Sequence, residues 1–141
     1  MPPDRSRSNE VIFFVDRCFG KRKVVNALRI AGYATIAHDE LFKQNEKDHI
    51  WLKQVAKMGY LILTFDEHLR TNTLEREAIR NSKASVFVLV SKRLTGDAMA
   101  EAFVKAAAAM IRFAQKHQRQ PFIAKVYATG EVKEWKWEHQ L

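Results

Sequence analysis

The chain has 141 residues, of which 47% are hydrophobic and 28% are charged, an ordinary balance for one soluble globular domain. Its formal net charge of +8 favours polyanionic partners such as nucleic acids, although anionic membrane surfaces and acidic proteins fit the charge as well. The single cysteine, Cys18, excludes an intrachain disulfide framework and a cysteine-rich zinc site. We expect a cytoplasmic protein with no membrane partner, because no secretory signal and no apolar run of membrane-spanning length are evident.

Short apolar runs, typical of strands, alternate along the chain with segments whose apolar residues recur at helical spacing. The predicted elements, in chain order, are a strand over Val11–Val15, a helix over Lys21–Ala31, a strand over Tyr33–Ala37, a helix from Asp48 to Gly59, a strand over Tyr60–Thr64, a helix over Leu74–Arg80, a strand over Ser85–Val90, a helix over Asp97–His117, and a closing strand pair over Phe122–Ala128 and Glu131–Trp135.

This alternation predicts a three-layer α/β/α domain with a mainly parallel central sheet and helices on both faces. Residues 1–10, rich in Pro, Arg and Ser, are expected to form a disordered leader. No repeat or composition break divides residues 11–141, so we expect one domain that includes the C-terminal helix and strand pair. Ligands of such sheets bind beyond the carboxyl ends of the strands, so the residues that follow each strand are the candidates for a site.

Acidic residues follow three of the predicted parallel strands. Asp16 comes directly after the first strand, Asp39 and Glu40 follow the second, and Asp66 follows the third. Asp48 opens a helix that should begin at the same edge. Hard divalent cations prefer carboxylate oxygens, and carboxylates gathered without a cation would repel one another. The pattern therefore predicts a site for Mg²⁺ or Mn²⁺ at this edge.

Each of these acids also has a structural interpretation. Asp48 alone is typical of a helix N-cap, and Asp66 is typical of a turn. Asp39 and Glu40 alone are typical of solvated loop acids. Asp16 is different, because a charge directly after a buried strand needs a partner. The metal-site prediction therefore depends on the acids acting together.

The segments FFVDRCFG and KDHIWLKQVAKMGYLILTFD, with Glu40 between them, resemble the PIN-like domains, the fold of many prokaryotic toxin ribonucleases. The likeness covers roughly Val11 to Val90 and is strongest in its order of acid, spacer, acid, helix, strand and Thr-x-Asp. It implies an Mg²⁺- or Mn²⁺-dependent endoribonuclease that hydrolyses RNA. It also implies the toxin of a type II toxin–antitoxin pair (VapC-like), with a cognate antitoxin as partner.

The resemblance also implies roles for individual acids. Asp16, Asp48 and Asp66 match the family acids as catalytic residues and metal ligands. Glu40 is taken as the remaining catalytic acid, with Asp39 as the alternative, because the loop gives no fixed spacing.

Two departures from the family pattern leave another function open. Arg17 and Cys18 stand after the first acid where small hydroxyl residues are common, and the helical segment before Asp48 is short. The alternative is a non-catalytic, degenerate RNA-binding or regulatory module on the same fold. An aspartyl-phosphate protein is a weaker alternative, because this chain lacks the further acidic residues that such a protein needs at the required positions.

Basic residues near the predicted site are candidates for phosphate contacts, with a solvated helix face as the alternative for each. The candidate RNA-binding residues are Arg17, Lys21, Arg22, Arg70 and Arg76. Two histidines that flank the acids, His38 and His68, are expected at the surface, since hard cations favour oxygen ligands. Cys18 is expected to be a small buried thiol.

Three further residues have two interpretations each. Thr64 is placed to hold Asp66 by a hydrogen bond, or to be satisfied locally. Trp135 and Trp137 fall on one face of the last strand. They suit a contact with a second subunit in a homodimer or with an antitoxin, and equally they suit packing onto the domain's own core.

Overall fold

The computed structural model describes residues 10–17, 21–91 and 93–137. The expected leader, apart from Glu10, and Cys18 lie outside the described residues. The elements are the strands β1 (Ile12–Val15), β2 (Ala34–Ala37), β3 (Leu61–Thr64), β4 (Ser85–Leu89), β5 (Phe122–Val126) and β6 (Val132–Glu134), the helices α1 (Lys21–Ile30), α2 (Asp48–Lys57), α3 (Thr73–Ser82) and α4 (Gly96–Lys116), and the short 3₁₀ helices η2 (His38–Glu40) and η3 (Glu67–Arg70).

The strands form one sheet in the order β2-β1-β3-β4-β5-β6. All neighbouring pairs are parallel except β5 and β6, which form an antiparallel hairpin. Val15 at the end of β1 lies in register with Ala37 of β2 and Leu63 of β3, so these three strands end at one edge. The predicted mainly parallel sheet is confirmed.

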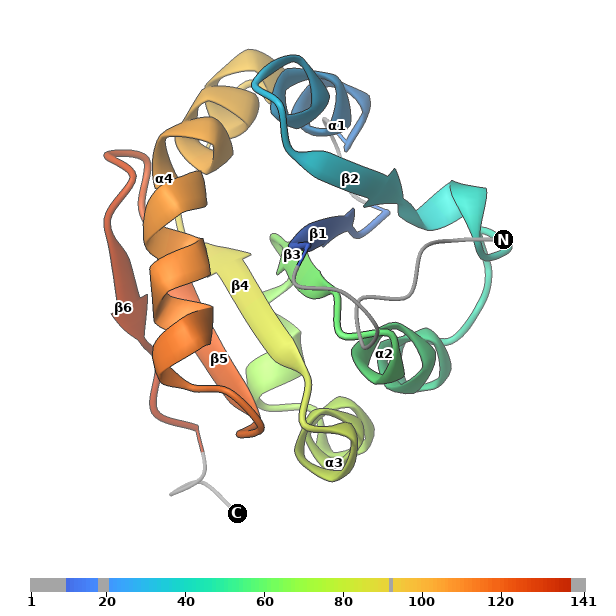
Figure 1. Cartoon of the computed structure of the whole chain (residues 1–141). Helices are drawn as coiled ribbons and strands as arrows, with labels where there is room; N and C mark the ends of the chain where they lie inside the picture. The colour runs from blue at the N-terminus through green and yellow to red at the C-terminus, as the bar shows by residue number, and fades with distance from the viewer. Residues whose placement is uncertain (1–9, 18–20, 92, 138–141) are drawn as a thin grey trace.

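Helices cover both faces of the sheet (Figure 1). α1 and α4 pack together on one face, and α2 and α3 pack together on the other. Along β1 the side chains alternate, so that Phe13 and Val15 enter the α1/α4 core while Ile12 and Phe14 enter the α2/α3 core. The continuous apolar run of this strand follows from burial on both faces.

Local signals in the sequence set the ends of the helices. Gly32 follows α1 with φ +97°, a left-handed conformation that favours glycine and lets the chain turn directly into β2. The side chain of Asn72 caps α3 by accepting from the N–H of Leu74 at 3.1 Å, and Thr95 caps α4 by accepting from the N–H of Ala98 at 3.1 Å.

The C-terminal tryptophans pack onto the domain itself. Trp137 is 4% exposed within the α2/α3 core, and its carbonyl accepts a 3.2 Å hydrogen bond from Arg76 Nη2. The cationic ends of Arg70 and Lys125 lie 4.5 and 4.9 Å from the ring centre of Trp135. Of the two interpretations of these residues, packing onto the domain's own core is the one that the structure shows.

Within the described part of the chain, none of the helices combines the length and the apolar character that crossing a membrane requires.

Candidate functional site at the carboxyl edge of the sheet

The connections that leave β1 and β3 run to opposite faces of the sheet. β1 continues into α1 on one face, whereas its neighbour β3 continues through η3 into α3 on the other. Ligands of open α/β sheets bind at such a switch point, outside the carboxyl ends of the strands. Asp16 and Asp66 are the acids that follow these two strands.

Asp16 is almost completely buried, with 6% of its surface exposed. Its Oδ2 accepts a 2.9 Å hydrogen bond from the hydroxyl of Thr64, and its Oδ1 accepts from the N–H of Arg17 at 2.6 Å. Burial raises the pKa of Asp16 to about 6, although the bonds from Thr64 and Arg17 lower it and the charge of Asp48 raises it further. The two hydrogen bonds hold the carboxylate in place, although its removal from water disfavours the charged form.

Thr64 links Asp16 to Asp66 across the two strands. While its hydroxyl donates to Asp16, the same oxygen accepts from the N–H of Asp66 at 3.0 Å. The Oδ1 of Asp66 accepts from the N–H of His68 at 2.9 Å and so caps η3. Asp66 is thus a turn-forming residue and lies at the predicted edge, while Thr64 holds its backbone.

Asp48 is held by two side-chain donors. It is the first residue of α2, and the N-cap position is Lys47. Its Oδ1 instead accepts from Arg17 Nη2 at 2.8 Å and from Trp51 Nε1 at 2.9 Å. The interpretation of Asp48 as a simple N-cap is therefore wrong, and its carboxylate lies near enough to Asp16 to raise the pKa of Asp16.

The guanidinium of Arg17 points inward and joins three groups. Besides Asp48, it reaches the carbonyl of Glu46 at 2.6 Å and Nε2 of His38 at 3.1 Å. His38 is fully buried among the rings of Phe14, Phe42 and Trp51, so the expectation that it lies at the surface is wrong. Burial and the charge of Arg17 lower the pKa of His38, which leaves a neutral ring able to accept from Arg17. His68 is exposed as expected.

The two loop acids make contacts with α1 instead. Oε1 of Glu40 accepts from Arg29 Nη2 at 2.8 Å and from the N–H of Ala37 at 2.7 Å. Asp39 binds Lys21 Nζ at 2.9 Å, and this hydrogen bond is the main cause that lowers the pKa of Asp39. The described structure thus groups the other three predicted acids and places Glu40 and Asp39 beside basic residues of α1.

Glu75 joins the group, although sequence analysis did not select it. It lies in the first turn of α3, and burial is the main cause that raises the pKa of its carboxyl group. The charges of Asp48 and Asp66 raise this pKa further, whereas its own backbone N–H and His49 lower it. The only sequence signal was its position three residues after the cap Asn72, which also suits an ordinary helix start.

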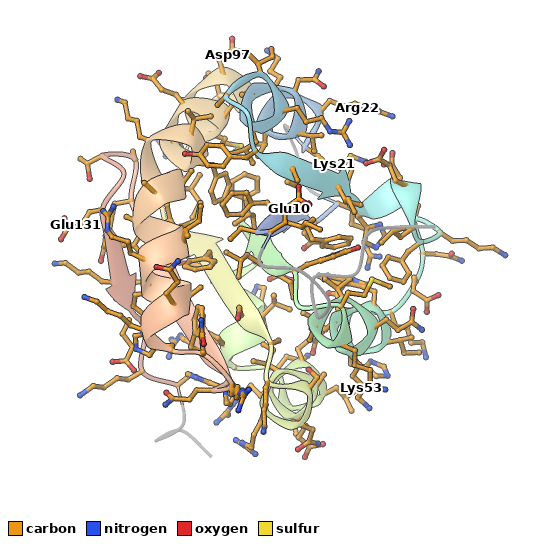
Figure 2. The ribbon with its side chains drawn as sticks, viewed as in Figure 1. Glu10, Lys21, Arg22, Lys53, Asp97 and Glu131 are labelled. Atoms are coloured by element: carbon orange, nitrogen blue, oxygen red, sulfur yellow. The ribbon has the colours of Figure 1, made fainter. Side chains whose placement is uncertain are left out.

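The predicted RNA-binding residues differ in accessibility. Arg22 is 79% exposed on α1 beside the Asp39 carboxylate (Figure 2). Arg76 is 7% exposed against Trp137, so the phosphate contact expected of it is not available. Arg17 points inward, Lys21 pairs with Asp39, and Arg70 stacks on Trp135. Lys43 and Lys47, which sequence analysis did not select, are exposed in the loop that leads to α2.

The donor set fits a hydrated divalent cation. Asp16, Asp48, Asp66 and Glu75 offer oxygen only, and Oε2 of Glu75 is sealed from solvent without a hydrogen-bond partner in the described structure. Among the described residues, no three metal-ligating side chains lie close enough to enclose a bare ion. Mg²⁺ typically keeps several waters and few direct carboxylates, so binding it does not require three protein ligands in contact with the ion.

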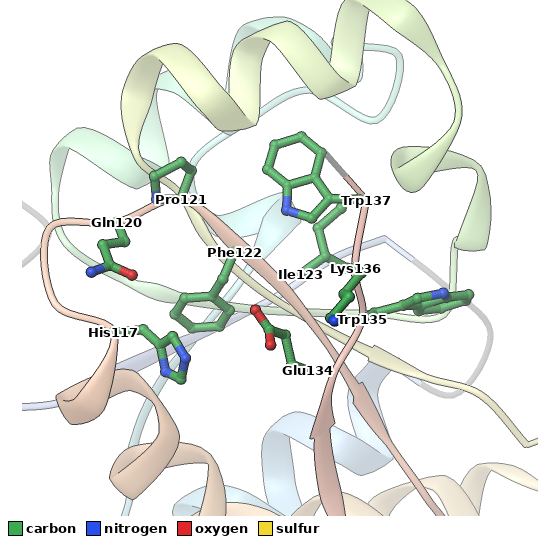
Figure 3. Close-up of a pocket in the computed structure, with 9 residues that line it drawn as sticks. All are labelled: His117, Gln120, Pro121, Phe122, Ile123, Glu134, Trp135, Lys136 and Trp137. Atoms are coloured by element: carbon green, nitrogen blue, oxygen red, sulfur yellow. The ribbon is translucent and has the colours of Figure 1, made fainter. Parts of the chain in front are cut away.

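The pocket in Figure 3 lies at the other edge of the sheet, where β5 begins. It has a volume of about 330 Å³ and contains none of the four clustered acids in its lining. The lining residues that the structure describes are His117, Gln120, Pro121, Phe122, Ile123, Glu134, Trp135, Lys136 and Trp137. The candidate site is therefore an open acidic edge and not this pocket.

Comparisons with known proteins identify the family of the chain. The family described as "PIN like domain" matches residues 11–91, the segment that carries Asp16, Asp48, Asp66 and Glu75. The chain is 28% identical over 138 residues to "Putative ribonuclease VapC45" from Mycobacterium tuberculosis (strain ATCC 25618 / H37Rv), an alignment that covers 94% of this chain and 99% of that protein. No solved structure gives a significant match.

Proposed function

The chain belongs to the PIN-like domain family, and from this membership and the acidic edge we propose that it is an endoribonuclease that uses Mg²⁺ or Mn²⁺ to hydrolyse RNA. The observation that carries the proposal is the convergence of Asp16, Asp48 and Asp66 at the switch point of the sheet, tied together by Thr64 and Arg17. The likeness to a protein named as a ribonuclease along nearly the whole chain supports it.

The residues of the edge have distinct tasks in this proposal. Asp16 and Asp66 hold the cation, directly or through water, and Asp48 completes its surroundings. Thr64 fixes Asp16 by its hydroxyl, while Arg17 and Trp51 fix Asp48 by donating to one of its oxygens. A bound divalent cation polarises the phosphate and lowers the pKa of the attacking water.

Basic side chains around the acidic edge bind the RNA backbone. Arg22, Lys43 and Lys47 are exposed around the segment between β2 and α2, which leaves the sheet at its carboxyl edge. The net charge of +8 attracts the substrate to the protein as a whole. By the same family likeness, we propose that the protein is the toxin of a toxin–antitoxin pair and that an antitoxin protein is its second partner.

One cleavage experiment tests this function. The purified protein is incubated with a mixed RNA pool and Mn²⁺, beside the variants Asp66→Asn and Asp97→Asn. Asp97 is a matched control, because it is an exposed aspartate whose pair with Lys23 is at the surface and contributes little. We expect wild type and Asp97→Asn to cut, Asp66→Asn to lose at least about a hundredfold in rate, and a chelator to stop all cutting.

Two results would contradict the proposal. Cleavage that persists in chelator or in Asp66→Asn would assign the activity to another site or to a contaminant. Binding of RNA without cleavage by any of the three proteins would favour the non-catalytic alternative, for which the Arg17–Asp48 pair is the supporting observation, because Arg17 already neutralises one of the acids.

A further inference from the structure

The hairpin of β5 and β6 carries basic and aromatic side chains on the α2/α3 side of the sheet. Ile123 of β5 enters the α2/α3 core, and side chains alternate along a strand, so Lys125 points to the same side. Lys133 of β6 lies directly opposite Lys125, and Trp135 follows two residues later. Lys133 is exposed, and Lys125 and Trp135 are half-buried, so this part of the sheet is open to solvent.

Each cation of this surface lies over an aromatic ring. The guanidinium of Arg70, at the end of η3, lies 4.5 Å from the ring centre of Trp135, and Lys125 Nζ lies 4.9 Å from the same ring. Lys133 Nζ lies 5.8 Å from the ring centre of Tyr127. We call these five residues the hairpin face. Proteins bind single-stranded nucleic acids with this combination, because phosphates meet the cations and bases stack on the rings.

The positive charge of the hairpin face is only partly compensated. Lys133 pairs at the surface with Glu131 at 3.2 Å (Figure 2). Neither Arg70 nor Lys125 forms an ion pair with another described residue. Like charges directly opposite each other destabilise an antiparallel strand pair, and Lys125 and Lys133 are such a pair. A polyanion bound across the hairpin would compensate these charges.

The hairpin face is continuous with the carboxyl edge of the sheet. Thr64 is in register with Val88 and Val88 with Lys125, so Lys125 lies two strands away from Thr64. Two strand spacings amount to about 10 Å. Arg70 ends the short helix η3, which begins after its cap Asp66. An RNA strand with a phosphate at the acidic edge can therefore continue onto the hairpin face.

We propose that the hairpin face binds single-stranded RNA beside the cleavage site, with a base stacked on Trp135 and phosphates on Arg70 and Lys125. This inference rests on the proposed function, because it assigns a binding surface to the substrate of that function. Figure 3 shows the ring of Trp135 on the side of its strand away from the Glu134 carboxylate. An acidic protein segment would use the cations alone, whereas an RNA base also uses the open ring of Trp135.

The test measures binding of a short fluorescent oligouridine in chelator, at several salt concentrations, to the full chain and its variants. We expect Trp135→Leu to weaken binding at least about fivefold and Trp135→Phe to weaken it less, since a phenyl ring still stacks. Lys125→Gln should lower the slope of log affinity against log salt by about 0.7, the value for one phosphate contact. The control is Lys116→Gln, an exposed lysine in the last turn of α4 on the other face, which should leave both unchanged.

Melting temperatures separate a binding surface from a structural one. If Trp135→Leu and Lys125→Gln lower the melting temperature but bind oligouridine as wild type does, with the same salt slope, the inference is overturned. Lys125→Gln removes no ring from the core, so its salt slope decides the question even if Trp135→Leu does not fold. Displacement of the oligouridine by polyglutamate of equal charge, as effectively as by unlabelled oligouridine, would assign the surface to an acidic protein and also overturn the inference.

Cleavage in Mn²⁺ separates this inference from the proposed function. If wild type cuts RNA and Lys125→Gln and Trp135→Phe cut it with an unchanged KM, the hairpin face is overturned and the proposed function stands. If wild type binds oligouridine through the hairpin face but cuts no RNA, the binding surface stands and the proposed function fails.

Discussion

Asp16 shows how a single carboxylate is held in an unfavourable place. It follows β1 directly, and the fold gives it two fixed donors, the Thr64 hydroxyl and the Arg17 N–H. These donors do not outweigh burial, which raises its pKa to about 6. A residue kept buried and ionisable beside other acids is the pattern expected of a functional site.

The raised pKa predicts how stability depends on pH in metal-free protein. The folded state binds the Asp16 proton more tightly than the unfolded chain does, whose pKa is near 3.8. The stability that Asp16 contributes is therefore full below pH 3.8, falls as pH rises toward 6, and is lost above that. The difference amounts to on the order of 3 kcal/mol.

Asp16→Asn, which cannot ionise, is expected to avoid this loss. Measured by urea unfolding in chelator, the stability of the variant relative to wild type should rise between pH 4 and pH 8. Asp97→Asn, at an exposed position, should show no such trend. A difference between Asp16→Asn and wild type that is independent of pH would contradict the account.

Individual site residues were only partly predictable from the sequence. Asp16, Asp48 and Asp66 were found because the ends of parallel strands and the starts of the helices between them meet at one edge. Glu40 was selected for its place in a loop. An acid in a loop can form an ion pair with any nearby basic side chain, and Glu40 pairs with Arg29. Asp48 and Asp66 affect the pKa of Glu75 because α3 packs against α2, an arrangement that no local pattern encodes.

At the scale of elements, the start of α3 determines the position of Glu75. The Asn72 side chain satisfies two N–H groups that would otherwise lack partners at the helix end. We expect Asn72→Ala to lower the free energy of unfolding by about 1 kcal/mol, measured by urea denaturation. Asn72→Ser, which restores a capping oxygen, should recover most of that loss.

Asn81→Ala provides the matched control for the cap. Asn81 is exposed inside the same helix, where alanine is the better helix former, so this change should be neutral or slightly stabilising. An equal loss from Asn72→Ala and Asn81→Ala would show that the cap does not stabilise α3.

Elements were more predictable than site residues, for physical reasons. Strands and helix ends are encoded locally, by apolar runs such as Val11–Val15 and by a glycine such as Gly32. The ends of β1 and α1 lie within one or two residues of the predicted positions. The 3₁₀ turn over His38–Glu40 was expected to be a polar loop. His38 is buried there because Arg17 gives its ring a hydrogen-bond partner and aromatic residues surround it, and both are contacts between distant segments.

At the scale of the whole molecule, the sheet order and the charge act together. The order β2-β1-β3-β4-β5-β6 places the switch point beside Asp16 and Asp66, and the excess of basic residues gives the molecule as a whole the opposite charge. An acidic centre on a basic molecule suits a polyanionic substrate whose reacting phosphate needs a cation between it and the carboxylates. The class of fold was predictable, because strand–helix alternation permits few arrangements.

The position of Mn²⁺ in crystals of the protein, located by its anomalous scattering, tests the proposed metal site. We expect a peak at the carboxyl edge of β1 and β3, with Asp16, Asp48 and Asp66 as its nearest carboxylates, and loss of that peak in Asp66→Asn. Peaks only elsewhere, or no peak at a Mn²⁺ concentration that supports cleavage, would contradict it.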